Sequence, residues 1–215
     1  MADEPITPKD AASSESVAET VDKSPEAKPE VKVEAKPAKP TPPPPPPDPR
    51  TEAALALGNA IKVSVDGKFG DNTVQEITNS KSVPVLLIDS AKWYDVVLFL
   101  KEDEAHAYDY MELMAGTDYK DYIEVVIYVY STTHKHYISL KTRSPRDDAR
   151  LSSITPIYAG ANWEEREVYD LLGIHFEGHP DLRRIMMWEE WNGYPLRKDF
   201  SEFDNLPVRG GGTKS

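Results

Sequence analysis

Residues 122–143, YIEVVIYVYSTTHKHYISLKTR, decide the fold. In the first half, the odd positions from Ile123 to Val129 are aliphatic and alternate with tyrosines and other side chains, which places them on one face of a strand. Lys135–Arg143 alternates again, and the short polar link at 131–134 predicts an antiparallel hairpin. One apolar and one mixed face are typical of a sheet that is covered on one side.

Upstream of this hairpin, local patterns predict four further elements. They are a helix over 52–62, strands over 73–78 and 83–88, and a helix over 91–101. The first helix should end before a turn at Asp66-Gly67, and Asp89-Ser90 offers the second helix an N-cap. Pro84 cannot donate to a β-ladder, which should push the start of its strand toward the edge of the sheet.

Downstream, residues 162–173 carry signals for the start and the end of a helix. Asn162 can serve as its N-cap, Glu165 can close a capping box, and Gly173 stands where a left-handed glycine ends a helix. Arg166 and Asp170 are spaced i, i+4, which favours an ion pair along the helix surface.

The residues on either side of that helix show no clear periodicity of apolar side chains. Residues 144–151 are charged and are predicted to form a loop. From Ile174 onward, glycine and proline recur among aromatic and charged residues, which favours an ordered, extended arm. The sequence therefore predicts an α+β fold: an antiparallel or mixed sheet with helices on one face, followed by a helix and an extended C-terminal arm.

Composition divides the chain into four parts. The first 50 residues are rich in Pro, Ala, Lys and Glu, and such a segment cannot bury enough apolar surface to offset the entropy of ordering. We expect a disordered tail over 1–50, an α+β domain over 51–160, a helix with an extended docking arm over 161–203, and a flexible C-terminus over 204–215.

Charge and cysteine content exclude several functions. The net charge is −12 and no basic stripe is present, so nucleic acid is not an expected partner. The chain has no cysteine, which rules out disulfides, thiol nucleophiles and Cys-ligated zinc or iron–sulfur clusters. No apolar run reaches the roughly 18 residues of a membrane span. The acidic N-terminus resembles neither a secretory signal nor a transit peptide, so we expect a cytoplasmic chain.

The arm contains candidates for metal binding and acid–base chemistry. His175 and His179 have HxxxH spacing, but Gly178 and Pro180 disfavour the helix that this spacing requires, so we expect histidines that hydrogen-bond the backbone of a turn. The preceding helix carries four carboxylates: Glu164, Glu165, Glu167 and Asp170. No nucleophile or positioned histidine accompanies them, so a capped, salt-bridged helix accounts for them better than a catalytic site.

Arginines of the arm could bind an anion, but ion pairs with nearby carboxylates are favoured because the guanidinium fork matches a carboxylate. We expect Arg183 to hold a buried carboxylate, so that Arg183→Ala would cost about 3–5 kcal/mol. No catalytic constellation emerges. What remains is a set of residues of the types that anchor buried protein interfaces: Trp163, Trp188, Trp191, Arg183, Arg184 and Arg197.

Three consecutive motifs carry a specific resemblance. ANWEEREVYDLLGIHF (Ala161–Phe176), GHPDLRRIMM (Gly178–Met187) and GYPLRKDF (Gly193–Phe200) resemble the signature of the 30-kilodalton subunit of respiratory complex I, the proton-pumping NADH:quinone oxidoreductase. In bacteria this protein is known as the C subunit of the complex. The resemblance covers about residues 52–203.

The resemblance implies a cofactor-free structural subunit of the peripheral arm of that complex. Such a subunit has no catalytic site of its own and supports electron transfer from NADH to quinone coupled to proton translocation. Its partners would be other subunits of the peripheral arm, above all the large quinone-site subunit, and those subunits would hold NADH, FMN, iron–sulfur clusters and quinone. It would lie on the cytoplasmic side of the bacterial inner membrane, as a peripheral protein without a membrane span.

The motif residues of the family carry over to this chain with a structural and docking role. The helix motif contributes Trp163, Glu165, Arg166, Glu167, Asp170 and Gly173. The second motif contributes His179, Pro180, Asp181, Leu182, Arg183 and Arg184, and the third contributes Pro195, Leu196, Arg197, Lys198 and Asp199. Two departures are visible: Tyr194 stands where many members have His, and Ser201 stands where Pro is common.

Two other functions are compatible with the sequence. An equivalent subunit serves in membrane-bound hydrogenases and related dehydrogenases, and the motifs do not separate these complexes. The run Pro42–Pro47 would also suit a free-standing adaptor whose Pro-rich tail binds a domain that recognises polyproline II helices.

Overall fold

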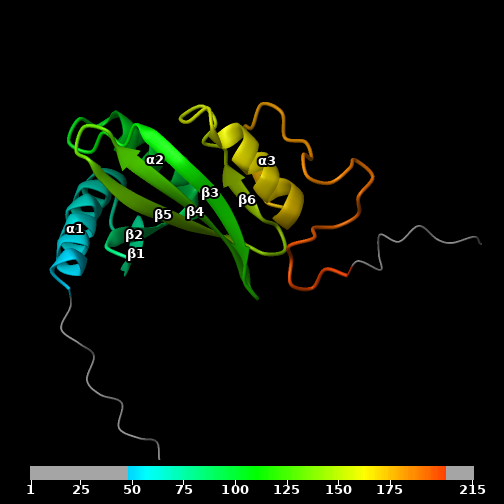
Figure 1. Cartoon of the computed structure of the whole chain (residues 1–215), viewed down its shortest axis with the longest axis horizontal. Helices are drawn as coiled ribbons and strands as arrows, with labels where there is room; N and C mark the ends of the chain where they lie inside the picture. The colour runs from blue at the N-terminus through cyan, green and yellow to red at the C-terminus, as the bar shows by residue number, and fades with distance from the viewer. Residues whose placement is uncertain (1–47, 202–215) are drawn as a thin grey trace, which may run out of the picture. The chain divides into compact units, whose positions relative to one another are not determined.

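A computed structural model describes residues 48–201 of the chain (Figure 1). Its elements, in chain order, are α1 (Pro49–Phe69), β1 (Val74–Ser80), β2 (Val83–Ile88), the 3₁₀ turn η1 (Ser90–Lys92), α2 (Trp93–Glu102), β3 (Tyr110–Asp118), β4 (Tyr122–Ser131), β5 (His136–Pro145), β6 (Arg150–Ser152), α3 (Ala161–Leu172) and β7 (His175–Glu177).

Five strands form one mixed sheet in the order β1-β2-β5-β4-β3. Its centre is the predicted hairpin, in which β4 and β5 pair antiparallel from Tyr122↔Pro145 to Ser131↔His136. β2 is the parallel neighbour of β5, and the outer strands β1 and β3 are antiparallel to theirs. The predicted α+β fold with a mixed sheet is confirmed.

The strand register places the helices on one face of the sheet. A row of apolar side chains crosses that face from β1 to β3: Ile77, Leu86, Leu140, Ile127 and Met114. α1 meets the row where Gly58 approaches Ile77, and α3 lies on the same face where Val168 and Leu172 approach Gly116. The buried side of α2 joins the same core.

α1 is longer than the sequence predicts. The helix continues through Asp66-Gly67, where we expected a turn, and ends at Gly70, which has a φ of 102°. The carboxylate of Asp66 does not start a turn because it accepts hydrogen bonds from Lys62 Nζ at 2.6 Å and from the Val74 N–H at 2.9 Å. These bonds tie the helix to the first strand.

The other upstream elements follow the predictions closely. The strand over 83–88 is β2, and the helix over 91–101 is η1 with α2, capped by Asp89, whose Oδ1 accepts the Ala91 N–H at 3.2 Å. Pro84, which we expected near an edge, lies in an inner strand. The ladder with β5 begins only at Val85, so at the proline β2 has a neighbour on the β1 side alone.

Two features are absent from the sequence predictions. β3, with the sequence YMELMAGTD, is rich in residues that favour helices, and a bulge between Met111 and Leu113 breaks its alternation. β6 and β7 form a small parallel sheet. The loop predicted over 144–151 is therefore shorter, because β5 extends to Pro145 and β6 begins at Arg150.

The predicted domain boundaries stay predictions. The tail over 1–50 and the C-terminus over 204–215 fall outside the described residues, except for residues 48–50, which lead into and begin α1.

Replacing Gly116 by Ala should destabilise the protein, because the new methyl group would lie 2.5 Å from Leu172 Cδ1 and 3.1 Å from Val168 Cγ1. Displacing α3 from β3 should lower the free energy of unfolding by about 1–3 kcal/mol, measured by urea denaturation.

Gly67→Ala is the matched control. A Cβ at Gly67, in α1, meets nothing within 4 Å, so the higher helix propensity of alanine should stabilise the protein by about 0.5–1 kcal/mol. The same effect from both substitutions would show that α3 does not pack closely on β3.

Candidate functional site

Three buried carboxylates connect α3 to the loops and the arm around it. They are Glu165 and Asp170 on α3 and Asp118 at the end of β3. Burying a charge without hydrogen-bond donors is costly, and each of the three collects its donors from a different part of the chain. The arm, coloured orange to red in Figure 1, lies beside α3.

Glu165 does not close a capping box, contrary to the prediction. α3 begins at Ala161 with Gly160 as N-cap and no side-chain cap, so Asn162 is already inside the helix. The Glu165 carboxylate instead accepts hydrogen bonds from the segment after β6: from Ser153 Oγ at 2.7 Å, the Ile154 N–H at 2.7 Å and Thr155 Oγ1 at 3.2 Å. Desolvation raises the pKa of this carboxyl to about 6, although the three donors oppose it.

Asp170 holds the arm. The predicted i, i+4 pair with Arg166 does not form; Arg184 Nη1 donates to Asp170 Oδ1 at 2.5 Å instead. Asp170 Oδ2 accepts three consecutive backbone N–H groups of the arm, from Ile185 at 3.0 Å, Met186 at 2.7 Å and Met187 at 2.9 Å. Burial opposes ionisation of Asp170, but the backbone donors and Arg184 outweigh it and leave the pKa below its ordinary value.

Arg183 is not the buried arginine, so the expectation attached to it is wrong. Its side chain is 67% exposed and pairs with Asp181 at 2.9 Å, whereas the side chain of Arg184 is 14% exposed. Arg166 is used differently again: its Nε donates to the Arg183 carbonyl at 3.1 Å, and its guanidinium lies 5.0 Å from the centroid of the Trp163 indole.

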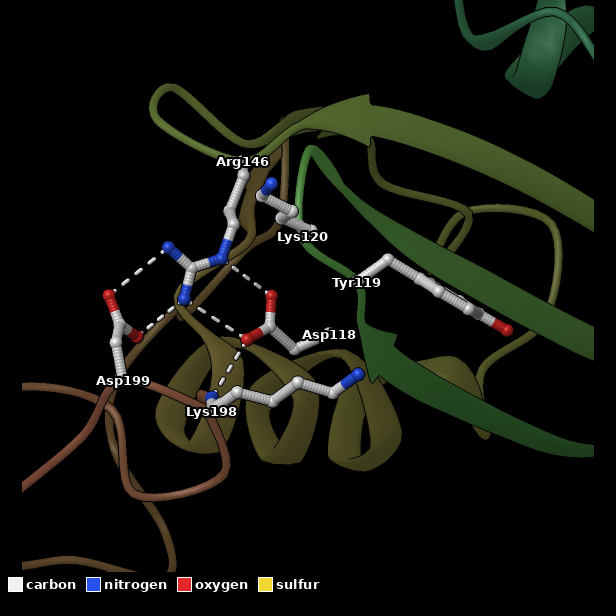
Figure 2. Close-up of a pocket in the computed structure, with 6 residues that line it drawn as sticks. All are labelled: Asp118, Tyr119, Lys120, Arg146, Lys198 and Asp199. Atoms are coloured by element: carbon white, nitrogen blue, oxygen red, sulfur yellow. Dashed lines mark hydrogen bonds and ion pairs between the residues drawn. The ribbon is translucent and has the colours of Figure 1, made fainter. Parts of the chain in front are cut away.

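Figure 2 shows the third connection, which sequence reasoning missed. Arg146, in the loop after β5, lies between two carboxylates: Nε and Nη2 donate to Asp118 at 2.8 Å and 3.1 Å, and Nη1 donates to Asp199 at 3.1 Å. The N–H of Lys198 donates to Asp118 at 2.8 Å. The Arg146 guanidinium holds the pKa of Asp118 below its ordinary value. These residues line a pocket of about 260 Å³.

The third motif closes the C-terminal end of α3. Gly173 ends the helix as predicted, with a φ of 78°, and a Cβ on it would lie 2.5 Å from the Tyr194 ring. Arg197 Nε donates to the Leu172 carbonyl at 2.7 Å, and the guanidinium lies 4.7 Å from the Tyr194 ring centroid. Arg197 thus satisfies a terminal carbonyl of the helix rather than pairing with Asp199.

His179 hydrogen-bonds the backbone of a turn, as predicted. Its Nε2 lies 3.1 Å from the Asn162 carbonyl oxygen, and its Nδ1 accepts the Asp181 N–H at 3.0 Å. His175 stands on β7, is exposed, and makes no side-chain hydrogen bond among residues 48–201, so the prediction is wrong for this residue. Among residues 48–201, no group of three or more potential ligand side chains is placed to hold a metal ion.

Large apolar side chains remain at the surface of α3 and the arm. Trp163 is 65% exposed, Trp188 59%, Leu196 59% and Met186 58%. Trp188 packs edge-on against the half-buried Trp191, with ring centroids 4.7 Å apart. We call Trp163, Met186, Trp188 and Leu196 the arm surface. Several large exposed apolar residues on one helix and its adjoining loop are typical of a surface that binds a partner.

The remaining motif residues differ in how deeply they are buried. Leu182 packs against the core and Pro195 is half-buried, whereas Glu167 and Pro180 are exposed. The motif residues therefore gather around α3, where their charged groups hold segments of the chain together. This arrangement can hold the exposed side chains of α3 and the arm in a fixed orientation.

Known proteins resemble most of the described chain. A family model described as the 30-kilodalton subunit of respiratory-chain NADH dehydrogenase matches residues 86–205. The NADH-quinone oxidoreductase C subunit of Chloroherpeton thalassium is 41% identical over 136 residues, which are 62% of this chain and 56% of that protein. Its counterpart in Chlorobium phaeobacteroides is 36% identical over 137 residues, 62% of this chain and 82% of that one.

The fold also recurs in a solved structure. One chain of the membrane-bound sulfane sulfur reductase, an archaeal respiratory membrane complex, superimposes with a TM-score of 0.55 at 24% identity, over 74% of this chain and 97% of that chain.

Asp170→Asn should destabilise the protein strongly, because it leaves the Arg184 guanidinium buried without its counter-ion. We expect the free energy of unfolding to fall by about 3 kcal/mol in urea denaturation at neutral pH. Arg183→Ala is the matched comparison: it removes only an exposed ion pair and should change the free energy by less than about 0.5 kcal/mol. The reverse ranking would show that Arg183 holds the arm.

Glu165 should make the protein less stable as the pH rises. Its carboxyl has a pKa of about 6 in the folded chain, against an ordinary value of 4.5. Between these values the folded state binds more protons than the unfolded state, so the free energy of unfolding falls as the pH increases through this window. The shift corresponds to about 2 kcal/mol.

Glu165→Gln removes this titration. The free energy of unfolding of the variant, relative to the original chain, should rise by about 2 kcal/mol between about pH 4 and about pH 7, measured by urea denaturation at each pH. Glu167→Gln, on the exposed side of the same helix, controls for the loss of one negative charge. A flat difference curve for Glu165→Gln would contradict the raised pKa.

Proposed function

We propose a structural role for this chain, which belongs to the family of the 30-kilodalton subunit of respiratory-chain NADH dehydrogenase. In this proposal the chain is a cofactor-free subunit of the peripheral arm of NADH:quinone oxidoreductase. It supports electron transfer from NADH to quinone, coupled to proton translocation, without a catalytic site of its own. The names of its relatives, which are C subunits of NADH-quinone oxidoreductase, support this role.

The observation that carries the proposal is how α3 and the arm use their side chains. The buried carboxylates Glu165, Asp170 and Asp118 are met by donors of the chain itself, while the four side chains of the arm surface face outward. A catalytic site needs reactive groups that are free in a cavity. Exposed aromatic and aliphatic anchors on a firmly held loop suit docking onto another protein.

The partner that we propose for the arm is the large quinone-site subunit, as the resemblance of the three motifs implies. NADH, FMN, the iron–sulfur clusters and quinone would be bound by other subunits. The cysteine-free composition of the chain supports this division, because thiolates are the usual ligands of iron–sulfur clusters.

The proposed location is peripheral, on the cytoplasmic side of the bacterial inner membrane. In the described part of the chain, no helix combines the length and the apolar character that crossing a bilayer requires. The chain would therefore meet the membrane through its partner subunits.

Trp188→Ser should weaken assembly without unfolding the chain, because it removes an indole that is 59% exposed. The loss of one aromatic anchor costs about 2 kcal/mol or more, or at least roughly 30-fold in affinity. The measurement is affinity purification of the tagged full-length chain from its native membranes, with the copurifying quinone-reductase subunits quantified. Thermal unfolding of the purified variant checks that the fold is kept.

Val63→Ser, which changes another strongly exposed apolar residue but on α1, is the control and should leave assembly intact. Deleting residues 1–47 should also leave assembly intact, and loss of the main partner on deletion would favour the adaptor hypothesis instead. Recovery of Trp188→Ser with a full complement of subunits would contradict the docking role of the arm.

A further inference from the structure

The sheet has a second face, on the side away from α1, α2 and α3. The register places Tyr110, Tyr130 and Tyr137 in one row across β3, β4 and β5, and places Leu113 beside Tyr128 in the next row. Residues directly opposite each other on neighbouring strands share a face and lie in contact distance. The ring centroids of Tyr130 and Tyr137 are 4.5 Å apart. We call Tyr110, Tyr130 and Tyr137 the tyrosine row.

The tyrosine row is open to solvent and continues into other apolar surface. Tyr110 is 55% exposed, Tyr137 38%, and Leu113 in the next row 39%. Where the rim of the sheet meets α1, Tyr137 also lines a groove of about 360 Å³, whose other walls include Val83, Leu57 and Arg50. The row is therefore part of an extended surface rather than an isolated exposed side chain.

A carboxylate without a salt-bridge partner in the described part of the chain borders this row. Glu112, at the bulge of β3, is exposed and forms no salt bridge with any side chain of residues 48–201. Its charge reaches the row: desolvation raises the pKa of the Tyr137 hydroxyl, and Glu112 raises it further. Farther along the same face the charges are balanced, since Glu124 pairs with Lys141 at 2.6 Å and with Arg143 at 3.0 Å.

Elsewhere the chain covers tyrosine rings with its own cations. Lys198 lies 5.6 Å from the ring centroid of Tyr119, Arg143 lies 4.7 Å from that of Tyr122, and Arg197 lies 4.7 Å from that of Tyr194. Within residues 48–201, no lysine or arginine lies over the tyrosine row. The faces of these rings attract cations, and the nearby carboxylate strengthens that attraction.

We propose that the tyrosine row and Glu112 form a docking site for a lysine or arginine side chain of a partner protein. The ring faces and the carboxylate select a cation, while Leu113 and the groove beside α1 offer apolar area to the residues that flank it. An open sheet face gives a small free cation few contacts, so the occupant is a protein segment. The site faces away from α3, and it stands independently of the docking proposed for the arm.

The test uses the tagged full-length chain in the complex purified from its native membranes. Tyr137→Leu keeps apolar area but removes an aromatic face, whereas Tyr137→Phe keeps the face. We expect Tyr137→Leu to weaken retention of one partner subunit by about two- to thirty-fold in a salt titration, and Tyr137→Phe to match the original chain. Glu112→Gln should weaken retention in the same direction.

Glu76→Gln is the matched control, because Glu76 is an exposed acid on the same face but at the far strand β1. Hydroxyl-radical footprinting gives a second readout: oxidation of Tyr110 and Tyr137 should fall in the complex relative to the full-length chain alone. Thermal unfolding of each variant checks the fold.

Equal oxidation of both tyrosines in the two states would overturn the proposal, since nothing would then cover the row. Equal retention with Tyr137→Leu and Tyr137→Phe would overturn the selection of a cation. Either result, obtained while Trp188→Ser still weakens assembly, would leave the docking role of the arm untouched.

Discussion

The burial of Asp170 is the constraint on which the shape of the C-terminal arm depends. A carboxylate at this depth is tolerated only when its oxygens are met by donors, because an unpaired buried charge costs several kcal/mol. α3 itself supplies none of these donors. They come from Arg184 and from three consecutive backbone N–H groups that follow it. To satisfy this one charge, the chain after α3 must fold back over the helix and run through a fixed conformation there.

Two further carboxylates are buried and also need donors from other parts of the chain. Glu165 ties α3 to the segment after β6, and Asp118 ties the end of β3 to Arg146 and through it to the arm. Much of the arm is thus held by charged groups rather than by apolar burial. Met186, Trp188 and Leu196 of the arm are consequently free to face outward, unlike the apolar side chains of a core element. In the docking role that we propose, an arm shaped in this way would reach its partner with its contact residues already in place, so little ordering entropy would oppose binding.

The parts of the fold that the sequence predicts are those whose signal is local. The hairpin over 122–143 repeats with period two, and α2 repeats its apolar residues at helical spacing, so both are found where they were expected. β3 escapes prediction because its bulge interrupts the alternation and its methionine, glutamate and leucine favour helices. The resemblance assigns the motif residues to α3 and the arm, but it does not give the contacts between them. The spacing of Arg166 and Asp170 allows an ion pair, yet Asp170 accepts its hydrogen bonds from Arg184 and from backbone N–H groups of the arm instead.

The ion pairs of Arg146 are the clearest example of contacts that the sequence does not predict. Arg146 lies 28 residues from Asp118 and 53 from Asp199, and no spacing rule relates such positions before the strands are assembled. The same holds for the tyrosine row, whose members come from three strands and become neighbours only through the register. α3 lies on one face of the sheet, where it packs on Gly116, and the tyrosine row lies on the opposite face. In such a two-layer domain, a partner bound on the open face of the sheet and a partner bound at α3 would not obstruct each other.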